Sequence, residues 1–384
     1  MHKIFRILFL LFFNLILIIE QGYSDEKKIK IGLLVPLTGE NAELGKQIVK
    51  ATRMALKEIN SNEIEVYPKD TQSNPNKTLQ SAKELGLMGI KIVVGPVFYS
   101  NLEYLDEIED TIFLSLTNKT LNLPKNVISA GINSTSQLNT IKKFIELNEI
   151  KKSIFLIPNF NYDLEIKKGI KNSKIKTLNE YFYDFEPTKL TKQIEKITNY
   201  EIRKQNLLDE IKRLENSDDP NKEKKVKSLE KKYTLGSLNF DSIIIADFDE
   251  SLKSVITSLI YTDVSPKNKY FITFNQWFDE SLLKETSSQP IFYPSINKKN
   301  LEDFEKKFSD KFNEKANHIS LLSYDLIGLI YYLSFKYDIA EIKKAFNSKN
   351  SFKGKIGIFE IENKEINHKL NFYKVENGSL KEIF

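Results

Sequence analysis

Cysteine is absent from the 384-residue chain, and histidine is scarce. Without thiols there is no disulfide framework, no thiolate metal site and no cysteine for the lipid modification of a lipoprotein. His2, His318 and His368 are isolated from one another along the chain, so a zinc site with the usual nitrogen and sulfur ligands is not expected. We therefore predict no metal and no cofactor.

The sequence also lacks a strong excess of charge of one sign. The 57 Lys and Arg residues stand against 52 Asp and Glu residues, giving a net charge of +5. No basic stripe interleaved with aromatic residues occurs, so nucleic-acid binding is not expected. Lysine-rich runs, such as residues 222–225, are interpreted as solvated helix faces.

Catalytic motifs are missing as well. No G-x-S-x-G elbow, phosphate-binding P-loop or G-x-G-x-x-G motif follows any predicted strand. The acidic residues offer many carboxylate pairs, but none of these pairs lies in a distinctive motif. The prediction is a protein that binds without catalysing a reaction.

The only long apolar run lies at the N-terminus. Two basic residues precede residues 7–19, and Gly22–Ser24 offers small residues at the positions that a signal peptidase reads. We expect a signal peptide over residues 1–24 and export to the periplasm. The alternative is an uncleaved anchor, but the run is shorter than the ~20 residues a span needs and ends at Glu20. The mature chain is predicted to have no stable membrane span and not to be a lipoprotein.

From Lys28 onward, short apolar runs alternate with stretches of helical periodicity. Strands are predicted at 28–36, 64–70, 91–96 and 111–117, and again at 153–159, 178–185, 241–248 and 269–274. A helix through Leu102 and Leu105 is expected after the third strand. Strands alternating with helices predict right-handed crossovers and parallel sheets covered on both faces. The predicted fold class is α/β, with two doubly wound parallel-sheet lobes.

Residues 187–233 interrupt this alternation. They are predicted to form a helix, a helix-breaking turn at 216–221 and a shorter return helix. Polar residues break the apolar seam, which indicates a short antiparallel helical hairpin and not a sustained coiled coil. The hairpin is interpreted either as a docking arm for a partner or as a decoration of the second lobe.

Candidate ligand-binding residues come from the turns that follow the predicted strands. Ligands of open parallel sheets bind beyond the carboxyl ends of the strands, where helix N-termini attract anions. For Asn41 and Ser100 the alternative is helix capping, and for Phe98 and Phe160 it is packing in the cleft wall. The candidates are Thr38, Gly39, Asn41, Phe98, Tyr99, Ser100, Thr117 and Asn118 in the first lobe, and Phe160 and Tyr162 in the second.

Four stretches resemble the type I periplasmic receptors, the leucine/isoleucine/valine-binding family. They are IKIGLLVPLTGENAELGKQIVKATRMALKEIN (29–60), KIVVGPVFYS (91–100), LLSYDLIGLIYYL (321–333) and FKGKIGIFEIEN with the later NFYKVENGSL (352–380). The resemblance implies three crossovers, placed near Ser134, Asn275 and Glu365, and hinge closure around a ligand. It implies a first lobe of residues 25–134 plus 275–365, and a second lobe of residues 135–274 plus 366–384.

The resemblance also implies where an amino-acid carboxylate is held: at Tyr99 or Ser100, and at Leu116 with Thr117 or Asn118. The sequence departs from the family pattern in the second lobe, where Asn159–Asp163 replaces an Asp…Tyr-Gly turn.

Two functions follow from this family. One is a receptor for a small polar ligand, an amino acid or related carboxylate, that delivers it to an ABC permease. The other is a non-catalytic envelope regulator, a penicillin-binding protein activator that docks on a peptidoglycan synthase. Such activators resemble this chain in the V-P-L-[ST]-G-x-x-A-x-L-G opening and in a charged helical insertion before the strand at 241–248.

Overall fold

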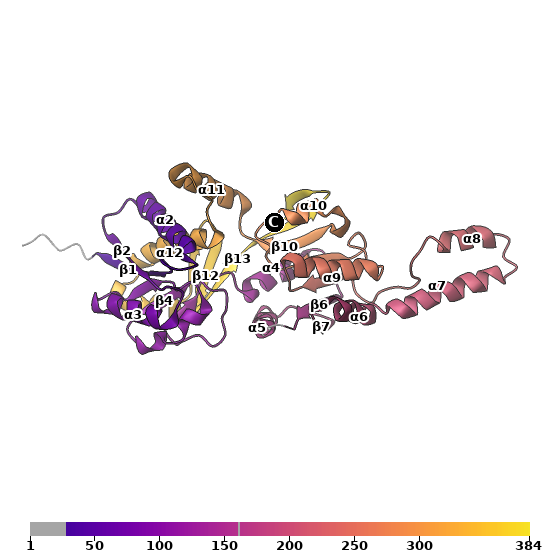
Figure 1. The fold of residues 1–384 in the computed structure, drawn as a ribbon, viewed down its shortest axis with the longest axis horizontal. Helices are drawn as coiled ribbons and strands as arrows, with labels where there is room; N and C mark the ends of the chain where they lie inside the picture. The colour runs from indigo at the N-terminus through magenta and orange to yellow at the C-terminus, as the bar shows by residue number, and fades with distance from the viewer. Residues whose placement is uncertain (1–27, 160–161) are drawn as a thin grey trace, which may run out of the picture.

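The computed structural model describes residues 28–159 and 162–384, so the predicted signal peptide at 1–24 and the candidate Phe160 lie outside it. The described residues form two α/β lobes side by side (Figure 1). A helical arm extends from the second lobe on the side away from the first. The predicted α/β class is confirmed.

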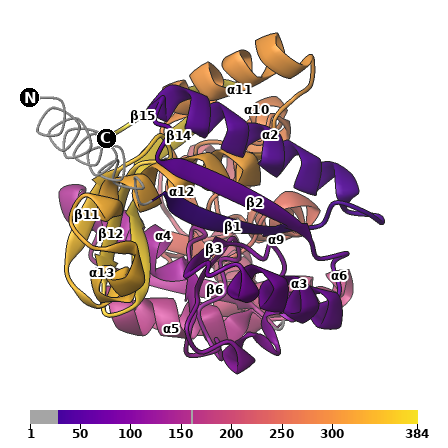
Figure 2. The ribbon, with the colours of Figure 1, turned by 90° about the vertical axis from the view of Figure 1, so that its left-hand side faces the viewer.

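The first lobe is built on a five-stranded sheet in the order β2-β1-β3-β4-β5, with every pair of neighbours parallel. Its central strands are apolar and fully buried because helices cover both faces. Figure 2 shows α2 lying across this sheet. The bounds are β1 (Ile29–Val35), β2 (Ile64–Asp70), β3 (Ile92–Val94), β4 (Ile112–Ser115), β5 (Val127–Ser129), α2 (Ala42–Ile59), α3 (Pro75–Leu87), α11 (Lys298–Phe312) and α12 (His318–Ser334).

The second lobe holds a seven-stranded sheet in the order β15-β14-β10-β9-β8-β6-β7. The five strands from β10 to β7 are parallel, and the last two strands of the chain add to the sheet as an antiparallel hairpin. The bounds are β6 (Ser153–Pro158), β7 (Asn179–Tyr183), β8 (Ser242–Ile245), β9 (Tyr270–Thr273), β10 (Ile291–Ser295), β14 (Asn371–Glu376), β15 (Ser379–Glu382), α4 (Ser134–Leu147), α5 (Asp163–Ser173), α6 (Pro187–Ile197), α9 (Asp249–Tyr261) and α10 (Ser281–Lys284).

A small third sheet completes the first lobe. Its antiparallel strands β11 (Asn350–Lys353), β12 (Ile358–Glu362) and β13 (Glu365–Lys369) follow the short helix α13 (Lys343–Asn347). Phe359 and Ile366 from this sheet lie in the same core as β1 and α12. Asp325 of α12 accepts backbone hydrogen bonds from Lys355 and Ile356, which fixes the turn before β12.

Two crossings between the lobes lie later in the chain than expected. β10 pairs with β9, so the chain leaves the second sheet at Ile296 and not near Asn275. β13 still belongs to the first lobe, which moves the last crossing from Glu365 to Leu370. β10 is a short apolar run without a long helix before it, and β13 is a mostly polar strand in an antiparallel sheet, so the alternation of strand and helix revealed neither of them.

The helix predicted through Leu102 and Leu105 is wrong. Two 3-10 turns, η1 (Tyr99–Leu102) and η2 (Leu105–Glu107), occupy this segment. The apolar spacing covers too few residues to repay the nucleation of an α-helix, and short segments of this kind tighten into 3-10 turns. Strand β5 is an element that the sequence pattern did not indicate.

The helical insertion also differs from its predicted form. The first helix is divided at Asn199, which has a positive φ of 50°. α6 is an ordinary crossover helix whose Leu190 and Ile194 lie in the core of the second lobe. The arm is therefore residues 200–233, with α7 (Tyr200–Glu215) and α8 (Lys222–Leu229) packed against each other (Figure 1).

Candidate functional site

The turns that follow β1 and β2 are linked by hydrogen bonds at the carboxyl edge of the first sheet. Thr38 Oγ1 donates to Asp70 Oδ2 at 2.6 Å, and the backbone N–H of Leu37 donates to Asp70 Oδ1 at 2.7 Å. Burial raises the pKa of Asp70, but these hydrogen bonds outweigh it and lower the pKa below its ordinary value. Asn41 Nδ2 donates to Ser73 Oγ at 3.1 Å. Both predicted side chains are therefore engaged within the lobe.

The residues after β3 are engaged in the same way. The hydroxyl of Tyr99 donates to the carbonyl of Leu121 at 3.1 Å, and the ammonium of Lys119 lies 4.8 Å from the centroid of its ring. Ser100 Oγ lies 3.5 Å from Asn101 Oδ1, and Phe98 packs against the core of the first lobe. The packing of Phe98 agrees with the alternative considered for that residue, whereas Ser100 lies inside η1 and its hydroxyl makes no capping hydrogen bond among the described residues.

The candidates after β4 and β6 differ in exposure. Thr117 is buried, and its carbonyl accepts a hydrogen bond from Ser129 Oγ at 2.6 Å, whereas Asn118 is exposed. Tyr162 packs against the core of the second lobe. Burial, together with the nearby charge of Glu165, raises the pKa of the Tyr162 phenol. Gly39 lies at a positive φ of 81° with open space beside it, as a tight turn requires.

Glu165, which is not among the predicted residues, joins the two lobes directly. Its side chain lies in the first turn of α5 in the second lobe, and the residue is only 4% exposed. The carboxylate accepts hydrogen bonds from the backbone N–H groups of Thr120 and Leu121 and from Thr120 Oγ1, at 2.8, 2.8 and 2.7 Å. Thr120 and Leu121 belong to the loop after β4 in the first lobe.

A second unpredicted cluster lies at the carboxyl ends of β7, β8 and β9. Tyr183 and Ser251 donate hydrogen bonds to the buried carboxylate of Asp247, and Gln276 Nε2 donates to the carbonyl of Asp247 at 3.1 Å. Gln276 is 5% exposed, and its Oε1 has no hydrogen-bond partner among the described residues. The acid directly after the apolar strand is the sequence signal that could have revealed this cluster.

Aromatic residues span the two lobes beside this cluster. Trp277, in the segment after β9, packs against the core of the first lobe and stacks on His318 at the start of α12. Phe278 packs against the cores of both lobes and meets the ring of Tyr373 edge-on. Burial lowers the pKa of His318 to about 4. His318 is therefore neutral at pH 7.

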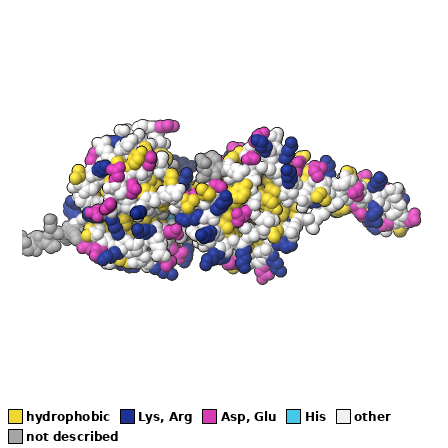
Figure 3. Space-filling view, turned by 90° about the horizontal axis from the view of Figure 1, so that it is seen from below, with side chains coloured by type: hydrophobic (Ala, Val, Ile, Leu, Met, Phe, Trp, Pro, Cys, Tyr) yellow, Lys and Arg dark blue, Asp and Glu magenta, His cyan; other side chains and the backbone are white. Residues whose placement is uncertain are grey.

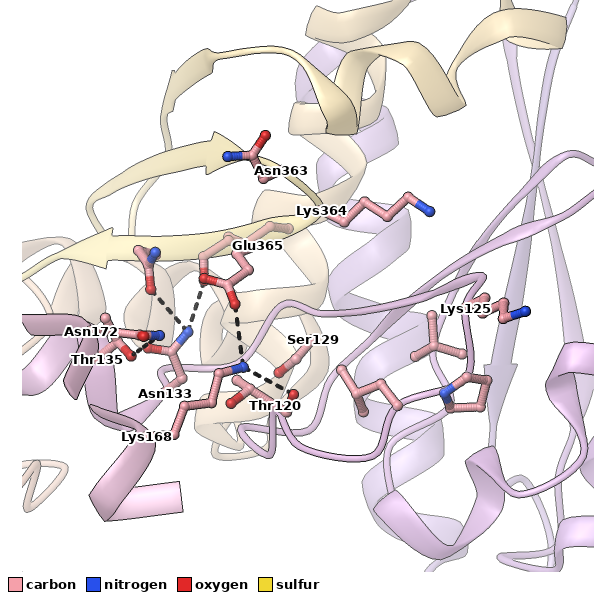
Figure 4. Close-up of a pocket in the computed structure, with 15 residues that line it drawn as sticks. Thr120, Lys125, Ser129, Asn133, Thr135, Lys168, Asn172, Asn363, Lys364 and Glu365 are labelled. Carbon is pink, nitrogen blue, oxygen red and sulfur yellow. Dashed lines mark hydrogen bonds and ion pairs between the residues drawn. The ribbon is translucent and has the colours of Figure 1, made fainter. Parts of the chain in front are cut away.

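A cavity of about 340 Å³ opens where both lobes meet the crossing strands (Figure 4). Lys168 of α5 reaches into this region, where its ammonium donates to the carbonyl of Thr120 at 3.2 Å and pairs with Glu365 at 3.2 Å. The lining is mostly polar or charged: Thr120, Lys125, Ser129, Asn133, Thr135, Lys168, Asn172, Asn363, Lys364, Glu365 and Asn367, with Leu123, Pro124, Val127 and Ile366. We call it the hinge cavity.

Within residues 28–159 and 162–384, no group of three or more His, Asp or Glu side chains is arranged to hold a metal ion. Over the same residues, no helix combines the length and apolar character needed to cross a bilayer.

Residues 28–200 match the family model described as periplasmic binding protein. No curated protein matches the sequence. Solved structures that match across nearly the whole chain include proteins of two kinds, and at these identities the likeness concerns the fold.

The C-domain of LpoA from Haemophilus influenzae, a regulator of PBP1A, is 15% identical to this chain with a TM-score of 0.63, over 92% of this chain and all of that one. The isoleucine complex of the branched-chain amino acid transporter substrate-binding protein LivJ from Streptococcus pneumoniae is 16% identical with a TM-score of 0.52, over 92% of this chain and 98% of that one. The leucine complex of an ABC transporter substrate-binding protein from Desulfitobacterium hafniense is 13% identical with a TM-score of 0.59, over 93% of this chain and 100% of that one.

Proposed function

We propose that this chain, which has the fold of the type I periplasmic binding proteins, is a non-catalytic envelope protein that docks on a peptidoglycan synthase through its helical arm. The match of residues 28–200 to the family model and the fold of the LpoA C-domain support the class of protein. The arm at residues 200–233 supports the mode of action.

The observation that carries the proposal is the exposure of large apolar side chains on a projecting element. Ile202, Leu208 and Tyr233 are 63%, 54% and 77% exposed. Lysines and acids are mixed along the arm, as Figure 3 shows, so the apolar groups lie in a polar surround. Apolar centres within polar rims are typical of protein–protein interfaces.

The arm is held firmly at its base and weakly along its length. Arg203 is buried at the base, where it donates hydrogen bonds to the carbonyl of Thr262 at 3.1 Å and to Thr234 Oγ1 at 2.6 Å. Further out, only Leu207 and Leu214 of α7 are buried, and α8 buries none of its residues. A short helix with so little burial gains stability from a surface that covers it.

The interlobe turns support the same proposal, because Thr38, Asn41 and Tyr99 already have partners within the first lobe. A ligand would have to replace these hydrogen bonds before it gained its own.

The test measures binding of the chain to the peptidoglycan synthases of the same cell, each purified, by surface plasmon resonance. Ile202→Ser/Leu208→Ser/Tyr233→Ser should reduce the affinity by at least ~100-fold, since apolar anchors at an interface centre contribute about 1–2 kcal/mol each. Leu87→Ser, at an exposed apolar side chain of the first lobe that is 90% exposed, is the matched control and should bind normally. Unchanged binding by the triple variant would refute the assignment of the arm.

A second candidate function is reception of a small polar ligand between the lobes, for uptake by an ABC permease. The unpartnered Oε1 of Gln276 favours it, because a buried acceptor without a donor is costly and a ligand amino group would satisfy it. Titration calorimetry with a panel of amino acids and small carboxylates tests this. Heat from one of them that is lost in Gln276→Met supports reception, and no heat from the whole panel excludes it.

A further inference from the structure

We propose that the Thr120–Leu121 loop is a carboxylate-binding site that the protein fills with its own Glu165, and that free carboxylates compete for it from the hinge cavity. The proposal is independent of the arm. It concerns residues other than those to which the family resemblance assigns a ligand carboxylate, Tyr99, Ser100 and Leu116 to Asn118.

The donors form a complete set for one carboxylate. Both oxygens of Glu165 are used: Oε1 accepts from two successive backbone N–H groups, and Oε2 accepts from the hydroxyl of Thr120. Successive backbone N–H groups form a concavity that binds anions, and hydrogen bonds to a charged acceptor are stronger than neutral ones. With the residue 4% exposed, this geometry is held out of water.

Glu165 does not use its carboxylate as a helix cap. The side chain lies in the first turn of α5, yet its three hydrogen bonds run to a loop of the other lobe, 44 or 45 positions away in the sequence. Lys168, one turn further along α5, donates to the carbonyl of Thr120. Two side chains of α5 therefore bind the loop: Glu165 accepts hydrogen bonds from the N–H groups of the loop, and Lys168 donates one to a carbonyl group of the loop.

A free carboxylate can reach the Thr120–Leu121 loop through the hinge cavity. Thr120 and Lys168 line the cavity, and Lys125 and Lys364 line it as well (Figure 4). With Glu365 as the single acid of the lining, the positive side chains outnumber the negative ones. An anion is therefore attracted toward the point where Glu165 holds the loop. Because Glu165 belongs to one lobe and its donors to the other, exchange for a free carboxylate would release one lobe from the other.

The experiment removes the internal carboxylate and returns it from solution. Glu165→Ala deletes the atoms that acetate contains, so acetate fits the space and acetamide is the neutral control of the same shape. Glu165→Ala should lower the melting temperature by about 3–6 °C, and ~100 mM sodium acetate should restore about half of this loss through binding to the folded state.

Acetamide and sodium chloride at equal concentration should have no effect, and acetate should not raise the melting temperature of the unaltered chain. In Glu165→Ala/Thr120→Val, which also lacks the hydroxyl donor, the restoration should fall at least twofold. Equal stabilisation of all variants by acetate, or none of Glu165→Ala, would overturn the proposal.

Glu165→Gln gives a second measurement that does not depend on folding of the alanine variant. Its amide keeps the shape but loses the charge, so acetate should compete at about a tenfold lower concentration than in the unaltered chain, since charge-assisted hydrogen bonds are stronger by roughly a factor of ten in equilibrium constant. The readout is the radius of gyration from X-ray scattering, which should rise as acetate separates the lobes. A radius that does not change in either chain at any acetate concentration contradicts the competition.

Discussion

The indole of Trp277 stacks on the imidazole of His318 across the two lobes, with ring centroids 4.1 Å apart and ring planes inclined by 23°. Trp277 is the one tryptophan of the sequence, so tryptophan fluorescence reports on the surroundings of this side chain, which include His318 and the core of the first lobe. We predict that His318→Ala moves the emission maximum to longer wavelength and costs about 1 kcal/mol of stacking. Emission spectra and urea unfolding check this, with Lys299→Ala, at an exposed position of α11, as the control. An unchanged spectrum in His318→Ala would show that the rings do not stack in solution.

Acid should destabilise the folded chain through its buried histidines. Burial lowers the pKa of His318 and of His368 to about 4, whereas an unfolded histidine titrates near 6.5. Between these values the unfolded chain binds more protons, so stability is complete above about pH 6.5 and falls as the pH drops toward 4. We expect a loss of about 2–3 kcal/mol for His368 and less for the partly exposed His318.

The measurement is urea unfolding at pH 7.5, 6 and 4.5. His368 Nε2 lies 2.9 Å from the carbonyl of Ala130, and its Nδ1 has no partner among the described residues. Burial raises the pKa of Asp325 to about 6, which favours the folded state at low pH and opposes the trend. In a His368→Gln variant, the free energy of unfolding should depend less on pH. If it changes with pH as steeply as in the unaltered chain, His368 is not a source of the acid sensitivity.

Asp325 should be essential to the first lobe. It accepts the N–H groups of Lys355 and Ile356 at 2.9 and 2.7 Å, and a Cβ on Gly354 would lie 2.4 Å from its Oδ2. Asp325→Ala leaves the N–H of the fully buried Ile356 unpaired, so we predict a loss of about 3 kcal/mol, and Asp325→Asn should lose less. Thermal unfolding checks that Asp325→Ala melts at a lower temperature than Asp325→Asn. Equal melting temperatures for the two variants would contradict this account of the turn.

Arg203 should control how rigidly the arm is held. Replacing it with methionine removes hydrogen bonds to Thr262, Thr234 and the carbonyl of Asp263 at the base of α7, while the lobes keep their own cores. We predict that the turn at 216–221 is cut at least ~10-fold faster in limited proteolysis, as local opening becomes about 1.5 kcal/mol easier. Arg213→Ala, at an exposed pair with Glu210, is the control and should be cut at the original rate. Equal cleavage rates for the Arg203→Met and Arg213→Ala variants would show that Arg203 does not hold the arm in place.

The sequence pattern predicted most of the strands because they are short, apolar and bounded by turn residues. The bounds 64–70 of β2 agree with the expectation at both ends. The opening motif has a steric basis, since a Cβ on Gly45 would lie 1.7 Å from the carbonyl oxygen of Pro36. The three residues of β5 are too few for a periodicity to be read, and β10 was missed because no full helix precedes it.

The sequence located the turns that carry the candidate residues, but it did not indicate the contacts that their side chains make. Turns after strands can be located from a sequence, and Thr38, Tyr99 and Thr117 lie in such turns. Their partners Asp70, Leu121 and Ser129 come from other segments, and no local pattern shows that these contacts form. Glu165 was missed for the same reason, because one acid in a helical stretch gives no sign of the distant loop that it binds.

The order of the segments has a consequence for how the molecule is made. The core that begins with β1 is completed only by Phe359 and Ile366, after every strand from β6 to β10 has been synthesised. During synthesis, the apolar surface of the first lobe therefore stays uncovered until the strands of the second lobe have been made. Removal of a few dozen residues from the C-terminus would take core residues from the first lobe and strands from the second. Substitutions in this segment should therefore reduce the yield of folded protein.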